Sequence, residues 1–428
     1  MFKNIVQRKL ERYVRKYFKK HPDIRLVVVA GSVGKTSTKV AIATVLSESF
    51  RVRLNEGNLN THMSTPLAIL GIKYPDNIKS IKEWLAVFKS ARTRIKSPTD
   101  VDIIVQELGS DRIGETEHFG RYLKPDIGVV TAVSPEHMEF FKNIDNVAKE
   151  ELAVANFSKQ ALINREDIEG EFAKYLTNVN MNTYGTSSVA EYNFTSTDYS
   201  IENGHEGTFK CPEYSDSVFV KIHVYGEHSL RPAIAGAAVA VKFNMNPSEI
   251  VSGLSKIRPQ PGRMNILKGY KNSIIIDDTY NSSPLAAEMA LREVYKISSP
   301  QRIVVLGSMN ELGDVSAEEH KKLGEMCDMN ELAWVITVGD EAEKYLAPAS
   351  RAKGCQVRCF KTSIQAGIFV KSIIEEGAVV LFKGSQGDIF LEEAVKIMLH
   401  STEDEKQLVR QSSAWMKTKE DFFSANLK

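Results

Sequence analysis

A short stretch between residues 26 and 46 constrains the fold of this chain more than any other feature. Residues 26–30 form an apolar, mostly β-branched run, which predicts a buried strand of a parallel sheet. The run breaks at Gly31, and helical spacing resumes over residues 38–46. The sequence therefore predicts a strand, a glycine-rich turn and a helix N-terminus in direct succession, which is typical of an α/β domain.

The turn has the composition of a phosphate-binding loop. Its pattern is G-x-x-G-K-T, shorter than the usual P-loop pattern with four residues between the glycines. Backbone N–H groups and the positive end of the helix would meet phosphate oxygens, Lys35 would add a positive charge, and Thr36 would ligate Mg²⁺. We therefore expect the chain to bind a nucleoside triphosphate. The predicted nucleotide-binding residues are Gly31, Ser32, Gly34, Lys35, Thr36 and Ser37.

Two further predicted strands end in residues suited to binding ligands. Residues 101–110 predict a second buried strand, and Glu107 ends its apolar run at the edge where open parallel sheets bind ligands. A carboxylate there is costly unless it is paired or bound to a metal, so we interpret Glu107 as a partner of Thr36 in holding Mg²⁺. Residues 127–133 predict another strand, and His137 follows it as a candidate functional residue.

Strands and helices continue to alternate through the rest of the chain. Residues 259–263 have the composition of a linker, and a second alternation begins after them. This pattern predicts an α/β fold with a central P-loop ATPase domain on a parallel sheet over residues 25–262 and a C-terminal Rossmann-like α/β domain over residues 263–428. Residues 180–225 are expected to be β-rich.

Residues 1–24 are predicted to form a basic amphipathic helix. Apolar residues recur there at helical spacing, with eight lysines and arginines among residues 1–20. Such a helix can pack on the next domain or lie on an anionic membrane surface, and both interpretations stay open. The Asn-rich residues 55–67 form either an ordinary loop or a substrate-binding one, in which Asn60 and Thr61 are the candidate contacts.

The composition argues against several other classes of protein. The 428 residues carry a formal charge of +1 and include 25% charged residues, so nothing asks for a nucleic-acid partner. Four cysteines without C-x-x-C or zinc spacing indicate a reducing, cytoplasmic location. No apolar run approaches the roughly 18 residues of a membrane span, and the N-terminus is too basic and too interrupted for a signal peptide.

Several motifs, taken together and in order, resemble those of the Mur ligase family. They are G-S-V-G-K-T-S at residues 31–37, Q-E-L-G at 106–109, the His137 loop, Gly262-Arg263, I-D-D-T-Y-N-S-S-P at 276–284, L-G-S-M-N-E-L-G at 306–313 and K-G-S at 383–385. Members of this family are ATP-dependent amide-bond ligases that build the peptide of bacterial cell-wall precursors. The D-D-x-Y-N and L-G-x-M-x-E-L-G segments look most like the MurF branch, which attaches D-Ala-D-Ala to the muramoyl tripeptide.

The resemblance implies a mechanism through an acyl phosphate. ATP would phosphorylate the acceptor carboxylate, and the amine substrate would then displace the phosphate. Lys35 and Arg263 would place positive charge around the phosphates, Asp278 would hold the ribose, and His228 falls in the adenine-contacting stretch of the family. The implied substrate contacts of the C-terminal domain are Asn281, Ser283, Lys383 and Ser385.

The second Mg²⁺ site implied by the resemblance departs from the family pattern. The family has a carbamylated lysine fourteen residues beyond the histidine, and that position is Glu151 here. His137 would therefore bind the ion together with Glu151 or, with a two-residue shift, with a carbamylated Lys149. In the adenine-contacting stretch, H-N-x-x-N of the family is replaced by H-S-L-R-P at residues 228–232.

A third departure concerns the acceptor. About two dozen residues precede the phosphate loop, where the family usually carries a UDP-sugar domain. The acceptor would then lack UDP, be held differently or be recognised with a partner protein. The alternatives to a MurF-like ligase are a Mur-type ligase for another acceptor, of the polyglutamate or cyanophycin type, and an ATP-binding scaffold whose ligase site has decayed.

Overall fold

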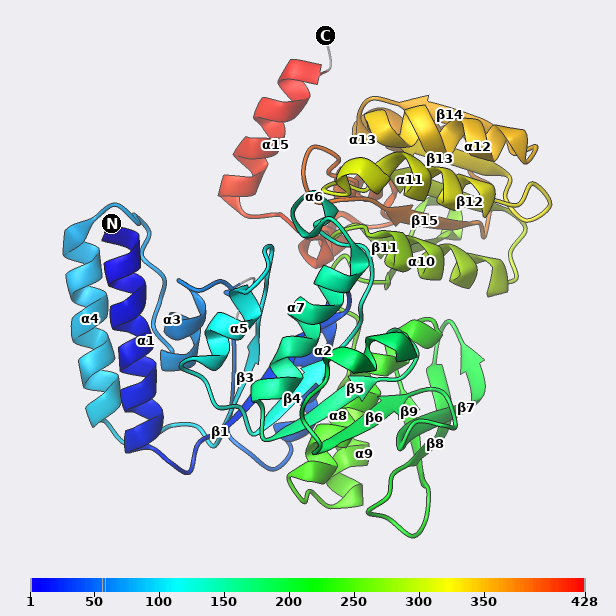
Figure 1. Cartoon of the computed structure of the whole chain (residues 1–428). Helices are drawn as coiled ribbons and strands as arrows, with labels where there is room; N and C mark the ends of the chain where they lie inside the picture. The colour runs from blue at the N-terminus through cyan, green and yellow to red at the C-terminus, as the bar shows by residue number, and fades with distance from the viewer. Residues whose placement is uncertain (1, 56, 58, 427–428) are drawn as a thin grey trace. The chain divides into compact units, whose positions relative to one another are not determined.

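The computed structural model describes residues 2–55, 57 and 59–426, and it divides into two compact units. The first unit comprises residues 1–134 and 140–257, and the second comprises residues 135–139 and 258–428. Each unit is built around its own sheet (Figure 1). Residues 135–139 group with the second unit, whereas the predicted boundary at residue 262 places them in the central domain.

The first unit contains a nine-stranded sheet in the order β2-β3-β1-β4-β5-β6-β7-β8-β9. Neighbouring strands are parallel from β2 through β7, and β7, β8 and β9 form an antiparallel meander. The strands are β1 (Arg25–Ala30), β2 (Val52–Leu54), β3 (Ile103–Glu107), β4 (Ile127–Val130), β5 (Gln160–Asn164), β6 (Met181–Gly185), β7 (Tyr192–Ser200), β8 (Gly204–Lys210) and β9 (Val218–Ile222).

Three central strands end together at the phosphate loop. Val29 of β1 pairs with Glu107 of β3, and Ala30 of β1 pairs with Val130 of β4. All residues of β3 and β4 are buried, which explains why these strands are apolar runs without alternation. Because carboxyl ends of parallel strands share one edge of the sheet, the chain leaves β1, β3 and β4 close to Gly31.

Helices α2, α8 and α9 share one hydrophobic core with the sheet. Gly236 of α8 and Gly253 of α9 permit close approach to α2, because an added Cβ would lie 3.1 Å from Ala41 O and 2.7 Å from Val45 Cα. The α-helices of this unit are α1 (Phe2–Lys20), α2 (Lys35–Leu46), α3 (Thr65–Leu70), α4 (Ile81–Lys96), α5 (Glu115–Gly120), α7 (Ile144–Phe157), α8 (Leu230–Lys242) and α9 (Pro247–Lys256). Its 3₁₀ turns are η1 (Gly170–Tyr175) and η2 (Glu227–Ser229). Helix α6 (Met138–Phe141) contains residues of both units.

The N-terminal helix α1 packs on α3 and α4. Packing on the rest of the protein, the first of the two interpretations, therefore accounts for most apolar residues of α1. Phe2 and Ile5 of its first turn remain exposed. In the part of the chain that the structure describes, no helix is both long and apolar enough to span a bilayer. The buried apolar residues of α1 are Val6, Leu10, Tyr13, Val14 and Tyr17.

The second unit contains a six-stranded sheet in the order β10-β11-β15-β12-β13-β14. β10 is antiparallel to β11, and the other pairs are parallel. The register places Lys383 of β15 beside Asp278 of β11 and Leu306 of β12. Both sheets confirm the predicted α/β class. The strands are β10 (Asn265–Lys268), β11 (Ile274–Asp278), β12 (Arg302–Gly307), β13 (Trp334–Val338), β14 (Val357–Phe360) and β15 (Val379–Lys383).

Helices alternate with the parallel strands of this unit, as the sequence predicts. They are α10 (Pro284–Lys296), α11 (Ser316–Glu325), α12 (Ala347–Ala352), α13 (Ser363–Ile373), α14 (Glu392–Met398) and α15 (Ser413–Asn426), with short turns η3 (Tyr270–Asn272), η4 (Gly313–Val315), η5 (Ala342–Leu346) and η6 (Thr402–Gln407).

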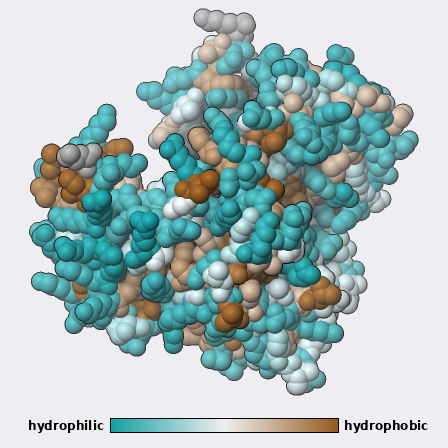
Figure 2. Space-filling model, in the orientation of Figure 1, coloured by the Kyte–Doolittle hydropathy of each residue, from teal (hydrophilic) through white to brown (hydrophobic). Residues whose placement is uncertain are grey.

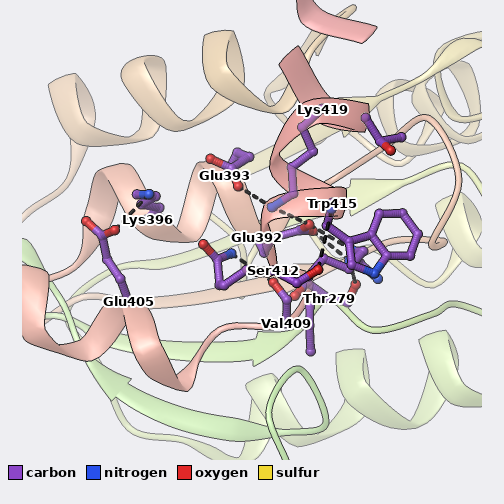
Figure 3. A network of polar contacts seen from close by, with 12 residues as sticks. Thr279, Glu392, Glu393, Lys396, Glu405, Val409, Ser412, Trp415 and Lys419 are labelled. Atoms are coloured by element: carbon purple, nitrogen blue, oxygen red, sulfur yellow. Dashed lines mark hydrogen bonds and ion pairs between the residues drawn. The ribbon is translucent and has the colours of Figure 1, made fainter. Parts of the chain in front are cut away.

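A buried ionic network ties the C-terminal segment to the second unit (Figure 3). Glu392 of α14 is fully buried, and both its oxygens accept hydrogen bonds from Arg410, at 2.8 and 2.6 Å. Lys419 of α15 lies 3.1 Å from the same carboxylate. Arg410 also donates to the carbonyls of Thr279 and Tyr280, at 2.6 and 3.0 Å. The loop that follows β11 is thus held in place by the C-terminal segment.

We expect Arg410→Met to destabilise the second unit by about 3 kcal/mol, because it leaves the buried Glu392 with Lys419 as its remaining partner. Arg292→Met is the matched control, since Arg292 pairs with Glu288 on the surface and should change stability by less than about 1 kcal/mol. Urea unfolding followed by tryptophan fluorescence measures both, with Trp334 in this unit. Equal losses in the two variants would contradict the network.

Candidate functional site

The phosphate loop requires glycine at two positions. Gly31 has φ of 130° and Gly34 has φ of 84°, both in the region that disfavours side chains. A Cβ at Gly31 would overlap the Thr131 hydroxyl and lie 2.8 Å from Ala132 N. Gly34 is the residue before α2, so the left-handed turn delivers the chain directly into the helix N-terminus.

Residues that directly follow β4 hold the phosphate loop through hydrogen bonds. Thr131 Oγ1 lies 2.5 Å from the carbonyl oxygen of Val33. Ser32 donates its N–H to Ala132 O at 3.0 Å, and the Ser32 hydroxyl accepts the N–H of Ser134 at 2.8 Å. Sequence reasoning did not select Thr131 or Ser134, because their role depends on a strand that is almost a hundred residues away.

Lys35 is the first residue of α2, and its side chain turns back across the loop. Its ammonium group donates to the carbonyl of Gly31 and lies 3.4 Å from the carbonyl of Ser32. Residues 33–37 are partly exposed, which leaves this part of the loop accessible to a ligand. The predicted nucleotide-binding residues therefore form one continuous loop at the carboxyl edge of the sheet.

Glu107 is the centre of a polar cluster next to the loop. Its Oε2 accepts a hydrogen bond from Thr36 Oγ1 at 3.0 Å and lies 3.1 Å from Lys39 Nζ. Its Oε1 accepts a hydrogen bond from Asn60 Nδ2 at 3.0 Å, and its backbone N–H donates to Asn55 Oδ1 at 3.2 Å. The structure thus brings together the predicted Thr36, Glu107 and Asn60.

Lys39 and Asn55 complete this cluster and were not predicted. Both Glu107 and Lys39 are 2% exposed, so the ammonium group neutralises the carboxylate inside the protein. A signal was present in the sequence, since Lys39 lies one helical turn beyond Lys35 and is the one charged residue among the mostly apolar residues 38–46.

The donors at this cluster fit Mg²⁺. The hydroxyl of Thr36 and the carboxylate of Glu107 are oxygen ligands, and Mg²⁺ takes one or two such groups together with waters and substrate phosphates. Among the described residues, no group of three His, Cys, Asp or Glu side chains converges into a complete protein cage for a metal. Thr36 and Glu107 would therefore share the ion with the nucleotide.

Glu151 and Lys149 point to opposite sides of α7. Glu151 is 3% exposed, and its Oε2 accepts the N–H of Gly31 at 2.6 Å. Lys149 is exposed, and its Nζ lies 5.2 Å from the centroid of the Tyr175 ring. Two residues of an α-helix are separated by about 200°, so the position that faces the phosphate loop is Glu151.

The predicted adenine-contacting stretch lies beside a polar cluster around Asp167. His228 lies in η2 and is half-buried. Three residues later, Arg231 holds both oxygens of Asp167 at 2.7 Å, and Asn164 Nδ2 also donates to Asp167 at 2.7 Å. Burial raises the pKa of Asp167 even though Arg231 opposes this shift. Thr61, a predicted substrate contact, forms hydrogen bonds with Ser64.

In the second unit, His137 contacts the L-G-x-M-x-E-L-G motif. Its Nδ1 lies 2.7 Å from an oxygen of Glu311, and its Nε2 lies 3.5 Å from Glu136. Both His137 and Glu311 have positive φ, of 49° and 65°. Such backbone strain in two paired residues is typical of positions that are held for a function.

Four of the predicted residues of the second unit meet at the ends of β11 and β15. Asp278 Oδ2 lies 2.6 Å from Lys383 Nζ, and Lys383 also donates to the carbonyl of Asn281 at 3.0 Å. The Ser385 hydroxyl accepts the N–H of Asn310 at 2.8 Å and lies 3.4 Å from the carbonyl of Ser282.

The two remaining residues predicted for this unit lie near the same loop. The Arg263 guanidinium lies over the ring of Tyr280, 4.0 Å from its centroid, in a cation–π contact. Ser283 is the N-cap residue of α10.

Asp277 precedes this group and is completely buried. Its carboxyl accepts hydrogen bonds from Gly262 N at 3.1 Å and from the Thr279 hydroxyl at 2.6 Å. Desolvation raises the pKa of Asp277 to about 6, although these hydrogen bonds oppose the shift. The carboxyl therefore titrates close to neutral pH inside the folded unit.

Comparison with known protein families gives two matches. The family described as Mur ligase middle domain matches residues 29–240, and the family described as Mur ligase, glutamate ligase domain matches residues 262–386. The UDP-N-acetylmuramoyl-tripeptide–D-alanyl-D-alanine ligase of Bacillus subtilis is 27% identical, with a match over 88% of this chain and 76% of its own length. The Escherichia coli enzyme of that name is 24% identical over 74% of this chain and 65% of its own length.

Solved structures share the fold. MurF from Acinetobacter baumannii matches with a TM-score of 0.75 and 20% identity, over 90% of this chain and 79% of that one. MurF from Thermotoga maritima in complex with ADP matches with a TM-score of 0.74 and 22% identity, over 93% of this chain and 84% of that one.

Because Asp277 is buried, we expect the second unit to lose stability as pH rises. In the unfolded chain an aspartate titrates near pH 3.8, and in the folded unit near pH 6, so between these values the folded state binds more protons than the unfolded state. The contribution of Asp277 to the free energy of unfolding is fully present below about pH 4 and falls by about 3 kcal/mol as the pH rises past 6. Asp277→Asn should remove this part of the pH dependence.

Urea unfolding at a series of pH values tests this expectation by the difference between the wild type and the variant. Asp340→Asn is the control, because the Asp340 side chain is 87% exposed. Parallel stability curves for the wild type and Asp277→Asn would contradict the expectation.

Proposed function

The chain belongs to the Mur ligase family of ATP-dependent amide-bond ligases, and we propose that it adds a D-Ala-D-Ala dipeptide to the peptide of a cell-wall precursor. The relatives from B. subtilis and E. coli bear names that describe this reaction, which supports the choice of substrates. The observation that carries the proposal is the cluster of Lys35, Thr36 and Glu107 at the phosphate loop, because this arrangement binds a nucleoside triphosphate.

The reaction has two steps. An oxygen of the acceptor carboxylate attacks the γ-phosphorus of ATP, so that an acyl phosphate forms and ADP leaves. The amine nitrogen of the second substrate then attacks the acyl carbon, an amide bond forms, and inorganic phosphate leaves with loss of one proton from nitrogen. Charge builds up on the phosphoryl oxygens in the first step, and catalysis requires fixed positive groups around them.

The first unit supplies these groups. The ammonium of Lys35 is held across the loop by the carbonyls of Gly31 and Ser32, so it needs little reorganisation to reach a phosphate. Thr36 and Glu107 would hold Mg²⁺, which would supply additional positive charge to the nucleotide phosphates. Lys39 balances the charge of the Glu107 carboxylate and helps to orient it, because its ammonium group is buried 3.1 Å from Oε2.

A second ion site is proposed at Glu151 of the first unit. The Glu151 carboxylate is anchored to the N–H of Gly31 and so lies at the base of the phosphate loop. A glutamate is shorter than a carbamylated lysine, but it supplies the same anionic oxygens without a modification.

We propose that the second unit binds the ribose and the amine substrate. Asp278 would accept hydrogen bonds from the ribose while Lys383 balances its charge. The loops that carry Asn281, Ser283 and Ser385 would bind the incoming dipeptide, and Arg263 would add a positive charge to this part of the second unit.

Release of ADP with a panel of substrates tests the proposed function. We expect turnover when the UDP-muramoyl tripeptide and D-Ala-D-Ala are both present, and none when either is omitted. Lys35→Ala should lower the rate by at least about a hundredfold, because it removes a charge that is aligned with the transition state. Turnover with a different acid and amine would assign another acceptor, and ATP hydrolysis that needs neither substrate would contradict a ligase.

A pair of variants on α7 tests the second ion site. Glu151→Gln keeps the shape of the side chain and an oxygen for the Gly31 N–H but removes the charge, so the Mg²⁺ concentration for half-maximal turnover should rise by roughly tenfold or more. Lys149→Gln is the matched control and should leave this concentration unchanged, because Lys149 lies on the opposite side of the helix. The reverse result would assign the site to Lys149.

A further inference from the structure

Five large apolar side chains are exposed where helices α1 and α4 begin. They are Phe2 (45% exposed), Ile5 (60%), Ile78 (56%), Ile81 (64%) and Leu85 (61%). Single exposed apolar residues are ordinary on a protein surface, but a contiguous group marks an interaction site. Whether these five form such a group depends on how the two helices are aligned.

Contacts further along the helices show that α1 and α4 run parallel with their first turns together. Lys9 Nζ lies 4.0 Å from the centroid of the Phe88 ring, and Arg92 donates to the Tyr13 hydroxyl at 3.1 Å. These contacts pair residues 9 and 13 of α1 with residues 88 and 92 of α4, so both helices run in the same direction. The same alignment brings the first turn of α1 beside the first turn of α4, as Figure 1 shows. The five side chains thus gather at the same end of the helix pair, which we call the apolar tip. Figure 2 shows hydrophobic residues exposed at the upper left, at this end of the pair.

The tip is held in a fixed shape. Trp84 is 2% exposed, and its indole N–H donates to the carbonyl of Ile78 at 2.9 Å. Ser80 caps α4, because its hydroxyl accepts the N–H of Glu83 at 3.3 Å. These hydrogen bonds fix the positions of Ile78 and of the first turn of α4, so docking would cost little conformational entropy.

The sides of the helix pair are strongly basic. Residues 1–20 and 71–96 contain fifteen lysines and arginines against three acidic residues, a formal charge of +12 in a chain whose total is +1. Exposed members of this set include Lys3, Lys82 and Lys89. Positive charge around an exposed apolar patch matches a surface that is both anionic and apolar.

We propose that the apolar tip docks on a membrane surface that contains anionic phospholipid. The five side chains would enter the boundary between headgroups and acyl chains, to a depth of about 5–10 Å, while the basic residues contact lipid phosphates. A nucleic acid or an acidic protein would satisfy the charges but would leave the aliphatic tip without a partner, so the lipid surface fits both features. This inference is independent of the proposed function.

Flotation of the full chain with lipid vesicles tests the proposal. We expect the chain to float with vesicles of phosphatidylcholine and phosphatidylglycerol, to bind more weakly to phosphatidylcholine alone, and to lose affinity at high salt. The double variant Ile81→Ser with Leu85→Ser should bind at least about tenfold more weakly, because it removes apolar burial. Lys82→Glu with Lys89→Glu should cause a loss of similar size.

Matched variants on the second unit separate docking from general surface effects. Ile368→Ser with Met329→Ser removes two side chains that are 59% and 56% exposed, and Lys353→Glu with Lys406→Glu makes the same charge change on exposed lysines. These controls should bind vesicles like the wild type. Absence of flotation with anionic vesicles, or equal losses in test and control variants, would overturn the proposal. Binding to RNA that needs Lys82 and Lys89 but not Ile81 and Leu85, without flotation, would also overturn it.

Discussion

The buried carboxylate of Glu107 is the interaction on which the first unit depends. It lies at the end of β3, where it would be unstable alone, and it is stabilised by groups from α2 and from the loop before α3. Lys39 neutralises its charge, Thr36 and Asn60 donate to its two oxygens, and Asn55 accepts its N–H. Removal of the carboxylate would therefore release both α2 and the loop that carries Asn60 from the end of β3.

The second unit repeats this arrangement at the edge of its own sheet. Asp278 ends β11 and Lys383 ends β15, and their side chains meet 2.6 Å apart with the lysine 2% exposed. In both units a strand-end carboxylate is paired with a buried lysine, so charge is concentrated at the edge where α/β proteins bind ligands. Arg410 supports this edge from the far end of the chain, through the carbonyls that follow Asp278.

Local sequence determined most of the fold and the phosphate loop, since strands, turns and helix starts depend on neighbouring residues. The α/β class and the loop around Lys35 follow from such patterns, and Glu107 follows from its position at the end of an apolar run. Sequence alone did not select Lys39 or Arg410, because Arg410 donates to the carbonyls of Thr279 and Tyr280, more than a hundred residues away, and the partners of Lys39 lie in other segments. It also left Glu151 and Lys149 open, because a choice between them requires the phase of α7 relative to Gly31.

The uneven distribution of charge along the chain would orient the protein at an anionic membrane surface. The helix pair formed by residues 1–20 and 71–96 carries +12, so the remaining residues together carry −11. An anionic surface attracts the pair and repels the rest, which turns the apolar tip toward the lipid before any side chain enters it. Screening limits this effect to about 10 Å at ordinary salt, so orientation occurs near the surface, where the tip already lies at the leading end of both helices. Charge would thus select the orientation, and burial of the five apolar side chains would then hold it.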